Sequence, residues 1–389
     1  MGVKPARAFS PDYAVPPGET VLEIIESLGI PQSELAERTG RPKKTINEII
    51  NGKAAITPET ALQFERVLGV PASFWNSLEQ NYRAALARIA ERERLEKQTD
   101  WLTEIPVKDL VRTGWIERRE SLVEQLEDVL SFFGVASVEA WRDVWGGVRN
   151  AVAFRESAVF ASEFGAVAAW LRRGELEARQ TRTRPFDALR FKSVLSDARK
   201  LTREEPDVFC DALASSCADA GVVVVFVREL PKLRVCGATR WLSSDRALIQ
   251  LTLRYKTEDH LWFTFFHEAG HILLHGKRSI FVEEVGGTVR GDARAEASAA
   301  RSIVEEEEEA NRFARDLLIP PDRYRAFVQA GEFSVASIYS FADSLGISPG
   351  IVLGRLQHDA VVPYRTNLNT ILKRSFRWAD ENDESHRPT

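Results

Sequence analysis

The five residues from His267 to His271, with the sequence HEAGH, constrain the fold of this chain more than any other stretch. Residues four apart lie on one face of a helix, so a helix here brings both imidazoles within reach of one metal ion. The neighbouring segments LWFTFF and ILL carry no charge and predict that this helix is buried. The alternative is an ordinary core helix, but burying two histidines and a glutamate without a metal would require several polar partners.

Glu268 lies between the two histidines and has a different expected role. It is one step further round the helix, where its carboxylate can accept a proton from water that a metal has activated. Zinc lowers the pKa of water towards neutrality and polarises a carbonyl group, and a carboxylate in this position can pass the proton to a leaving amine. The pattern therefore predicts a Zn²⁺ cofactor and the hydrolysis of peptide bonds.

A catalytic zinc site needs a third protein ligand, and the run from Ser302 to Pro320 (SIVEEEEEANRFARDLLIP) offers one. Its apolar residues recur at helical spacing and define one face: Ala310, Phe313, Ala314, Leu317 and Leu318. Glu307 lies on that face, three residues before Ala310, and Asn311 follows it by four. We expect Glu307 to bind the metal in preference to Glu309, and Asn311 to orient one of the histidines. The other glutamates of the run are expected to face solvent.

These two motifs resemble those of a known enzyme family. HEAGHILLH followed by EEEANRFARDLLIP is similar to the ImmA/IrrE family of zinc metallopeptidases, over about residues 220 to 360. The resemblance implies an α+β zincin-like fold in which His267, His271 and Glu307 hold zinc. It also implies that Glu268 is the general base, and that the substrate is a protein, often a helix-turn-helix repressor cut at one site.

The segments around these motifs predict two strands and a loop. Val222 to Val227 and Ala247 to Leu253 are β-runs, and an edge strand near the metal could bind an extended peptide. Which strand forms the edge stays open. Between His271 and Glu307 the chain has 35 residues, and the polar, Gly- and Ala-rich part from Glu283 to Arg301 predicts a loop beside the cleft.

The group that would stabilise an oxyanion also stays open. The candidates are Tyr255, His260, His275 and Arg240, and a structural role is the simpler interpretation of each. His275 follows His271 by four residues, but we do not expect it to bind the metal. Three imidazoles in one helical line would splay away from a single ion.

The N-terminal region carries a separate pattern, in which short helical segments alternate with turn residues. The segments run from Glu19 to Leu28, Gln32 to Thr39, Pro42 to Asn51, Pro58 to Leu68, and onwards from Pro71. The second and third segments fit a helix-turn-helix, in which apolar residues seat the third segment and polar residues face outward. The residues expected to contact DNA are Gln32, Arg41, Lys43, Lys44, Thr45 and Asn47.

The stretch from Ile30 to Trp75 resembles the HigA-type antitoxin and repressor domains nearly end to end. This resemblance implies that the domain binds double-stranded operator DNA as a homodimer. From Gly18 to Trp75 there are six Lys or Arg and eight Asp or Glu, so positive charge is local, at Arg38, Arg41, Lys43 and Lys44. A helical module used only for protein contacts is the alternative.

The composition agrees with several domains in one chain. The 389 residues are 44% hydrophobic, enough for two or three cores, and the net charge of −5 argues against general coating of nucleic acid. Three cysteines, Cys210, Cys217 and Cys236, lack the short spacing of a metal-binding pair, so we expect reduced thiols. No apolar run reaches the length of a membrane span and the first 18 residues lack a signal-peptide core. The expected location is the cytoplasm, without a membrane partner.

We therefore expect a multi-domain chain with an all-α helix-turn-helix domain, a helical middle domain and an α+β zincin-like metallopeptidase domain. The expected parts are a disordered leader (1–17), the helix-turn-helix domain (18–78), a helical linker (79–100), the middle domain (101–215), the zincin-like domain (216–360), and a C-terminal helix with a disordered tail (361–389).

Two regions allow more than one interpretation. Helices at Leu122–Phe133 and Val159–Leu171 indicate a middle domain that serves packing, and a sensor pocket is the alternative. Residues 341–357 look like a second helix-turn-helix. Their second helix, GIVLGRLQ, has almost no donors for phosphate or base edges, so we expect a helical hairpin packed on the peptidase core.

The sequence thus predicts a DNA-binding transcriptional regulator that carries a zinc-dependent endopeptidase acting on a partner protein, such as a repressor or related regulator. Two alternatives remain. One is an antitoxin that represses its own operon and neutralises a toxin partner by binding, and the other is a scaffold stabilised by structural zinc. Glu268 argues against both, because neither binding nor folding requires a general base.

Overall fold

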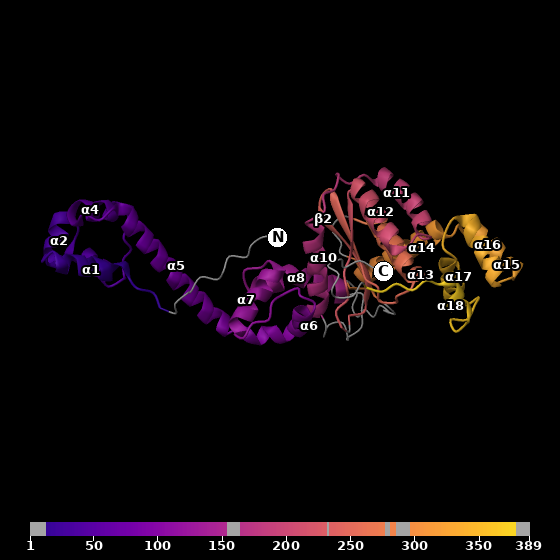
Figure 1. Ribbon diagram of the computed structural model, residues 1–389, viewed down its shortest axis with the longest axis horizontal. Coiled ribbons are helices and arrows are strands. Elements are labelled where there is room, and N and C mark those ends of the chain that lie inside the picture. The colour runs from indigo at the N-terminus through magenta and orange to yellow at the C-terminus, as the bar shows by residue number, and fades with distance from the viewer. Residues whose placement is uncertain (1–12, 154–163, 232, 277–280, 285–295, 379–389) are drawn as a thin grey trace. The chain divides into compact units, whose positions relative to one another are not determined.

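The computed structural model describes residues 13–153, 164–231, 233–276, 281–284 and 296–378 (Figure 1). The chain divides into two compact units. The first contains residues 1–100 and 120–127, and the second contains residues 101–119 and 128–389. The predictions of disorder in the leader and the tail fall mostly on residues 1–12 and 379–389, which lie outside the described residues.

The first unit is built from five helices: α1 (Pro17–Ser27), α2 (Gln32–Thr39), α3 (Lys43–Ile50), α4 (Pro58–Leu68) and α5 (Ala72–Glu96). Local signals set these bounds. Gly40 ends α2 in the left-handed conformation, with φ of 68°, and the Thr57 side chain accepts a hydrogen bond from Thr60 N at the start of α4. The predicted segments agree with these helices within two residues.

The core of this unit is made by apolar residues that recur at helical spacing on each helix: Val21, Ile25, Leu35, Ile46, Ile49, Phe64 and Trp75 are all buried. The predicted linker, residues 79–100, is helical as far as Glu96, where α5 ends, and α5 enters it from the packed unit without a break. Its first residue belongs to the packed unit: the Glu79 carboxylate accepts hydrogen bonds from Ile56 N and from Arg83 Nε.

The helices that follow along the chain surround an aromatic cluster. The elements are η1 (Thr99–Glu104), α6 (Val107–Arg112), α7 (Leu122–Phe133), α8 (Val138–Ala153), α10 (Phe164–Ala178), α11 (Ala188–Leu201) and α12 (Pro206–Asp219). The division between the two units falls within η1 and within α7. Trp101, Phe133 and Trp141 meet edge to face in this cluster. The helix predicted at 122–133 is confirmed, whereas the one predicted at 159–171 begins at Phe164 within the described residues.

A four-stranded sheet follows, with the strand order β1-β3-β2-β4. The strands are β1 (Val222–Phe226), β2 (Val235–Ser243), β3 (Arg246–Leu251) and β4 (Phe281–Glu284). β1 pairs with β3 in parallel, and β2 lies antiparallel to both β3 and β4. β1 and β3 were predicted, but β2 and β4 were not.

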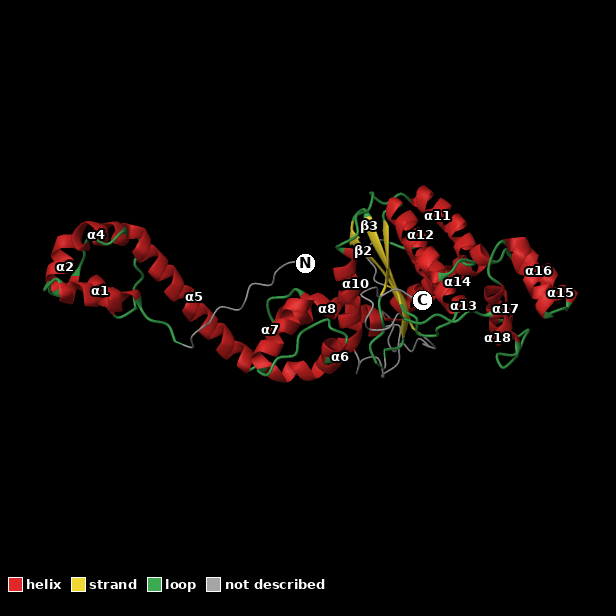
Figure 2. Ribbon diagram, in the orientation of Figure 1, coloured by secondary structure: helices red, strands yellow, loops and turns green. Residues whose placement is uncertain are grey.

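Helices cover both faces of this sheet (Figures 1 and 2). α10 lies on one face. There Trp170 Nε1 donates a hydrogen bond to Val227 O, and Trp170 O accepts one from Gln250 Nε2. On the other face the strands share one core with α11, α12 and α13 (Glu258–Leu274), through residues such as Leu195, Phe209, Ile249 and Phe265. The predicted boundary between a middle domain and a zincin-like domain stays a prediction, since this core contains helices from both.

The predicted loop from Glu283 to Arg301 is wrong at both ends. Glu283 and Glu284 lie in β4, and α14 (Glu296–Leu318) begins at Glu296. Residues 285–295, between these elements, lie outside the described residues. Helix propensity from the Ala- and Glu-rich sequence EASAAR explains the early start of α14, which a composition-based loop assignment overlooked.

Four helices complete the unit: α15 (Pro321–Ala330), α16 (Val335–Leu345), α17 (Pro349–His358) and α18 (Leu368–Leu372). As expected for a packed hairpin, α17 buries Ile351, Val352 and Leu353 in the core that contains α13. Within the described ranges no single helix is long and apolar enough to span a membrane, although the bent pair α16 and α17 passes that test of length and composition together.

The chain's last described segment is bonded to the start of α13. The Glu258 carboxylate is fully buried and accepts hydrogen bonds from Ser348 Oγ at 2.8 Å and Arg374 Nε at 2.7 Å. Next to it, Lys373 Nζ lies 2.6 Å from Asp259 Oδ2, and Thr257 forms a β-bridge with Ser375. These contacts fix the N-terminal end of the helix that carries the histidines.

Candidate metal centre and nucleic-acid interface

α13 presents the HEAGH motif from the interior of the second unit. His267 and His271 are 1% exposed and Glu268 is 0% exposed. The helix is apolar on nearly every side, which is the pattern of a helix buried within a core. The prediction of a buried helix at this position is confirmed.

α14 crosses α13 at Gly270, and this glycine permits the close approach. A Cβ atom at Gly270 would lie 3.1 Å from Phe313 Cδ1 and 3.3 Å from Ala310 Cα. The apolar stripe predicted on α14 therefore packs on the motif, with Ala310 and Ala314 fully buried. Glu307, one turn before Ala310, is thereby brought towards the histidines.

His267, His271 and Glu307 offer ligand atoms that all lie within 4.8 Å of one another. His267 Nε2 is 3.2 Å from Glu307 Oε2, and His271 Nε2 is 3.5 Å from Glu307 Oε1. The two Nε2 atoms are 2.9 Å apart. Two imidazole nitrogens and a carboxylate oxygen directed at one point are the donor set of catalytic zinc sites, so the residues fit a zinc ion.

The outward ring nitrogens of both histidines have partners. His267 Nδ1 lies 3.0 Å from Asn311 Oδ1, which is the contact expected of Asn311. His271 Nδ1 lies 2.9 Å from His275 Nδ1, and His275 Nε2 lies 3.3 Å from Glu309 Oε2. A partner at Nδ1 fixes the ring and leaves Nε2 for a metal. Glu309 therefore lies behind the cluster, and Glu307 lies within it.

The electrostatics favour an ionised carboxylate at Glu307. Burial alone would raise its pKa, but hydrogen bonds from His267 and His271, together with their charge, hold the pKa of Glu307 well below its usual range. An ionised carboxylate is the form that binds a cation. Of the other glutamates of the acidic run, Glu305, Glu308 and Glu309 are exposed as expected, whereas Glu306 is half-buried.

Strand β2 forms the wall next to Glu268, and sequence reasoning missed it. Thr239 Oγ1 donates a hydrogen bond to Glu268 O at 3.1 Å. A Cβ atom at Gly237 would lie 2.9 Å from Glu268 Oε1 and 2.5 Å from Thr264 Cγ2, so the carboxylate lies against bare backbone. A glycine inside an apolar run was the available signal, since it often marks a close approach of another group.

The four residues considered as oxyanion partners lie in three different surroundings. The guanidinium of Arg240 pairs with Glu175 Oε2 at 2.8 Å, so its charge is already compensated. His275 contacts His271, as described above. Tyr255 and His260 stack on each other, with ring centroids 4.2 Å apart, at a pocket nearer the start of α13. A role in oxyanion stabilisation stays a prediction for each of them.

The candidate DNA-contacting residues surround the start of α3. Lys43, Lys44 and Asn47 are exposed, while Ile46 and Ile49 on the opposite face are buried. The remaining candidates are half-buried: Gln32, Arg41 and Thr45. Arg41 Nε donates to Gln63 Oε1 at 2.7 Å, so this side chain is tied to α4. Lys44 Nζ is 3.8 Å from Glu48 Oε1, a loose contact that leaves the ammonium accessible.

Two family comparisons match the two regions separately. Residues 21–75 match the helix-turn-helix family, and residues 237–357 match the peptidase family described as IrrE N-terminal-like domain. The second match includes the HEAGH motif, Glu307 and strand β2 from Gly237 onwards. Both resemblances noted in the sequence are thereby confirmed at the level of the family.

Individual relatives match the N-terminal region. Virulence-associated protein A of Dichelobacter nodosus is 38% identical over 66 residues, which is 17% of this chain and 63% of that protein, so the chain spans just under two thirds of its length. An uncharacterised helix-turn-helix-type transcriptional regulator of Escherichia coli, YddM, is 30% identical over 71 residues, or 18% of this chain and 76% of that protein.

Two similar solved structures are antidote proteins. A HigA-family antidote protein from Coxiella burnetii is 28% identical and covers 22% of this chain and 92% of its own, with a TM-score of 0.21. A second one, a putative antidote protein of a plasmid maintenance system from Nostoc punctiforme, is 31% identical, with the same coverage and TM-score.

Proposed function

We propose that this chain, which belongs to the helix-turn-helix transcriptional regulators through its N-terminal domain, is a DNA-binding regulator with a zinc-dependent endopeptidase. The endopeptidase would be the IrrE N-terminal-like domain that matches residues 237–357. The observation that carries the proposal is the cluster of His267, His271 and Glu307 with Glu268 on the same turn of α13. Structural zinc would not require this glutamate.

In this proposal the three clustered residues hold the ion and Glu268 moves the proton. A zinc ion held there would supply a Lewis acid that polarises a peptide carbonyl and acidifies water. Glu268 would accept a proton from the attacking water and deliver it to the departing amine. Asn311 and His275 would hold the imidazoles in the tautomer that keeps Nε2 available. The buried position of the site excludes bulk water from the proton transfer.

The DNA-binding half would bring the peptidase to its substrate. α3 would enter the major groove of an operator, with the domain acting as a homodimer in the cytoplasm, where that DNA lies. Tethering a peptidase to the module that finds a promoter raises its effective concentration for a regulator bound nearby, without any new contact. The substrate we propose is therefore a partner protein, such as a repressor.

The test separates metal binding from hydrolysis. The Glu268→Gln variant should retain zinc and lose cleavage, whereas His271→Ala should lose most of its zinc. Zinc content is measured on protein purified without added metal, and cleavage by mass spectrometry after incubation with proteins encoded beside it. Glu309→Ala serves as the matched control for Glu307→Ala, and it should cost less zinc affinity.

Three outcomes would contradict the proposal. If Glu268→Gln lost as much zinc as His271→Ala, Glu268 would act as a metal ligand and its assignment as the general base would be wrong. Zinc binding without any Glu268-dependent cleavage would leave a metal-stabilised DNA-binding protein. A Glu268-dependent cut confined to residues 79–97 of the chain itself would indicate a self-cleaving switch in place of a partner substrate.

A further inference from the structure

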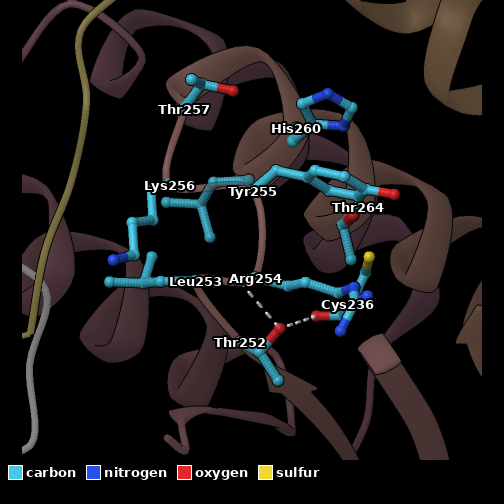
Figure 3. A pocket seen from close by; sticks show the side chains of 10 residues that line it. Cys236, Thr252, Leu253, Arg254, Tyr255, Lys256, Thr257, His260 and Thr264 are labelled. Carbon is cyan, nitrogen blue, oxygen red and sulfur yellow. Dashed lines mark hydrogen bonds between the residues drawn. The ribbon is translucent and has the colours of Figure 1, made fainter. Parts of the chain in front are cut away.

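A pocket lies near the start of α13 (Figure 3). Its walls are formed by the segment after β3, residues 252–257, by Cys236 on β2, and by His260 and Thr264 on α13. Thr264 precedes Glu268 by four residues, so the two lie on the same side of the helix. Nothing in the proposed proton transfer uses these residues. The pocket nevertheless shares a wall with the proposed catalytic base.

The shared wall is formed by β2 and Thr264. Cys236 lines the pocket, and the next residue, Gly237, has the bare backbone against which both Thr264 and Glu268 lie. Thr264 precedes Glu268 by one helical turn, which is about 6 Å along the axis. An extended peptide covers about 3.3 Å per residue, so a chain passing Glu268 would reach the pocket roughly two residues later.

Arg254 and Lys256 both bring positive charge to the pocket lining, and the Nε atom of Arg254 is buried. Arg254 Nη1 donates to Leu233 O at 2.5 Å, while its buried Nε–H meets no acceptor among the described residues. Within the described part of the chain, the residues that line the pocket include no aspartate or glutamate. Figure 3 shows the end of the Arg254 side chain beside Cys236 and Thr264, and the amine of Lys256 on the opposite side. The guanidinium is therefore a positioned donor and positive charge without a carboxylate partner in the pocket.

The remaining walls hold this arginine in place. The Tyr255 ring stacks on His260, and the guanidinium carbon of Arg254 lies 6.0 Å from the centroid of the Tyr255 ring. The turn is fixed by hydrogen bonds from Lys256 N to Leu253 O and from Phe376 N to Lys256 O, with Lys256 at φ of 56°. A left-handed conformation at a residue other than glycine is uncommon and recurs at functional sites.

We infer that this pocket is a substrate subsite that binds an acidic side chain, aspartate or glutamate, roughly two residues from the scissile bond. The inference rests on the proposed peptidase function and names part of its substrate. A carboxylate fits because a guanidinium forms charge-assisted hydrogen bonds with it, which a neutral amide of the same size forms less strongly. The Thr264 side chain and the Tyr255 ring line the same pocket, while the Thr252 hydroxyl is bonded to backbone atoms of Val235 and Arg254 and holds the turn.

The test is a digest of a peptide library derived from a bacterial proteome, with cut sites identified by mass spectrometry. Zinc-loaded wild type should enrich aspartate and glutamate at one position about two residues from the cut, on the order of tenfold over their background frequency. The Arg254→Met variant should lose this enrichment and keep cutting, while Arg254→Lys should retain part of it. Lys192→Met, which removes an exposed positive charge on α11 outside the pocket, should match wild type. Zinc content and circular dichroism confirm that each variant is folded.

The outcomes separate the two proposals. Cleavage without an acidic preference, or with a preference that survives Arg254→Met, overturns the subsite and leaves the peptidase standing. If wild type cuts no library peptide, the proposed peptidase function fails. The proposed subsite is then tested by peptide binding alone. Fluorescence anisotropy then compares two labelled hexapeptides that differ only by aspartate or asparagine, and equal affinity of wild type for both overturns the subsite.

Discussion

Replacing Gly237 by alanine would place a methyl group between β2 and α13. The new Cβ would lie 2.5 Å from Thr264 Cγ2 and 2.9 Å from Glu268 Oε1, whereas non-bonded carbon atoms are best separated by about 3.5–4.0 Å. The overlap with the threonine methyl group is thus about 1 Å or more. Inserting a methyl group into a packed core costs about 1–3 kcal/mol, and we expect this range for the free energy of unfolding.

The same contacts predict a partial rescue. Thr264→Ser removes the Cγ2 atom that the new methyl group meets, so the double variant should recover much of the lost stability. Activity should behave differently, because Glu268 still meets the added Cβ in the double variant. We expect cleavage to stay low in both, since a displaced base no longer reaches the proton it must transfer.

The assay is denaturation of the full chain in urea, followed by tryptophan fluorescence. Every tryptophan except Trp75 belongs to the second unit, so the signal reports mainly on the unit that contains Gly237. Gly146→Ala is the matched control, because a Cβ atom there meets nothing within 4 Å. If Gly237→Ala destabilised the chain no more than this control, or if Thr264→Ser gave no coupling with it, the proposed packing of β2 on Glu268 would be refuted.

Three further predictions concern other parts of the molecule. Lys43→Ala with Lys44→Ala should weaken operator binding and reduce the slope of log affinity against log salt by about two, measured by gel shift, with unchanged zinc content; an unchanged slope would make the module a protein-binding one. His275→Ala should lower zinc affinity about 10- to 100-fold in competition with a chelator, and unchanged affinity would exclude a positioning role. Burial tends to raise the pKa of Glu175, but Arg240 and Arg172 lower it to about 2. Its stabilisation should therefore be present above about pH 4.5 and fall towards pH 2, and an acid unfolding curve unchanged by Glu175→Gln would contradict this.

The N-terminal unit could be predicted almost residue by residue because its signals are local. Gly40 and Gly69 end helices in the left-handed conformation, and Thr57 caps α4 through its own side chain. Each of these features depends only on residues within one turn. The same reasoning selected Glu307 over Glu309, since the apolar face that runs through Ala310 is visible in the sequence.

Strand β2 could not be predicted in the same way. Its sequence VCGATRWLS shows no alternation of apolar and polar residues, and its polar members find their partners far along the chain. Thr239 bonds to Glu268, and Arg240 pairs with Glu175 on the opposite face of the sheet. The pocket around Arg254 was equally hidden, because the turn, the strand and the helix that form it meet only in the folded chain.

The bond between Glu258 and Arg374 sets an order for events during synthesis on the ribosome. The buried core cluster of helices α1 to α5 ends at Trp75, so these helices can pack together soon after they emerge. Helix α13 begins with a buried carboxylate whose charged partner is Arg374, 116 residues later. At about 5–20 residues per second, the interval between Trp75 and Arg374 lasts roughly 15–60 s. The newborn chain would thus complete its helix-turn-helix core well before the start of α13 gains its charged partner, and a ribosome that stalls late would release the helix-turn-helix domain without a complete IrrE N-terminal-like domain.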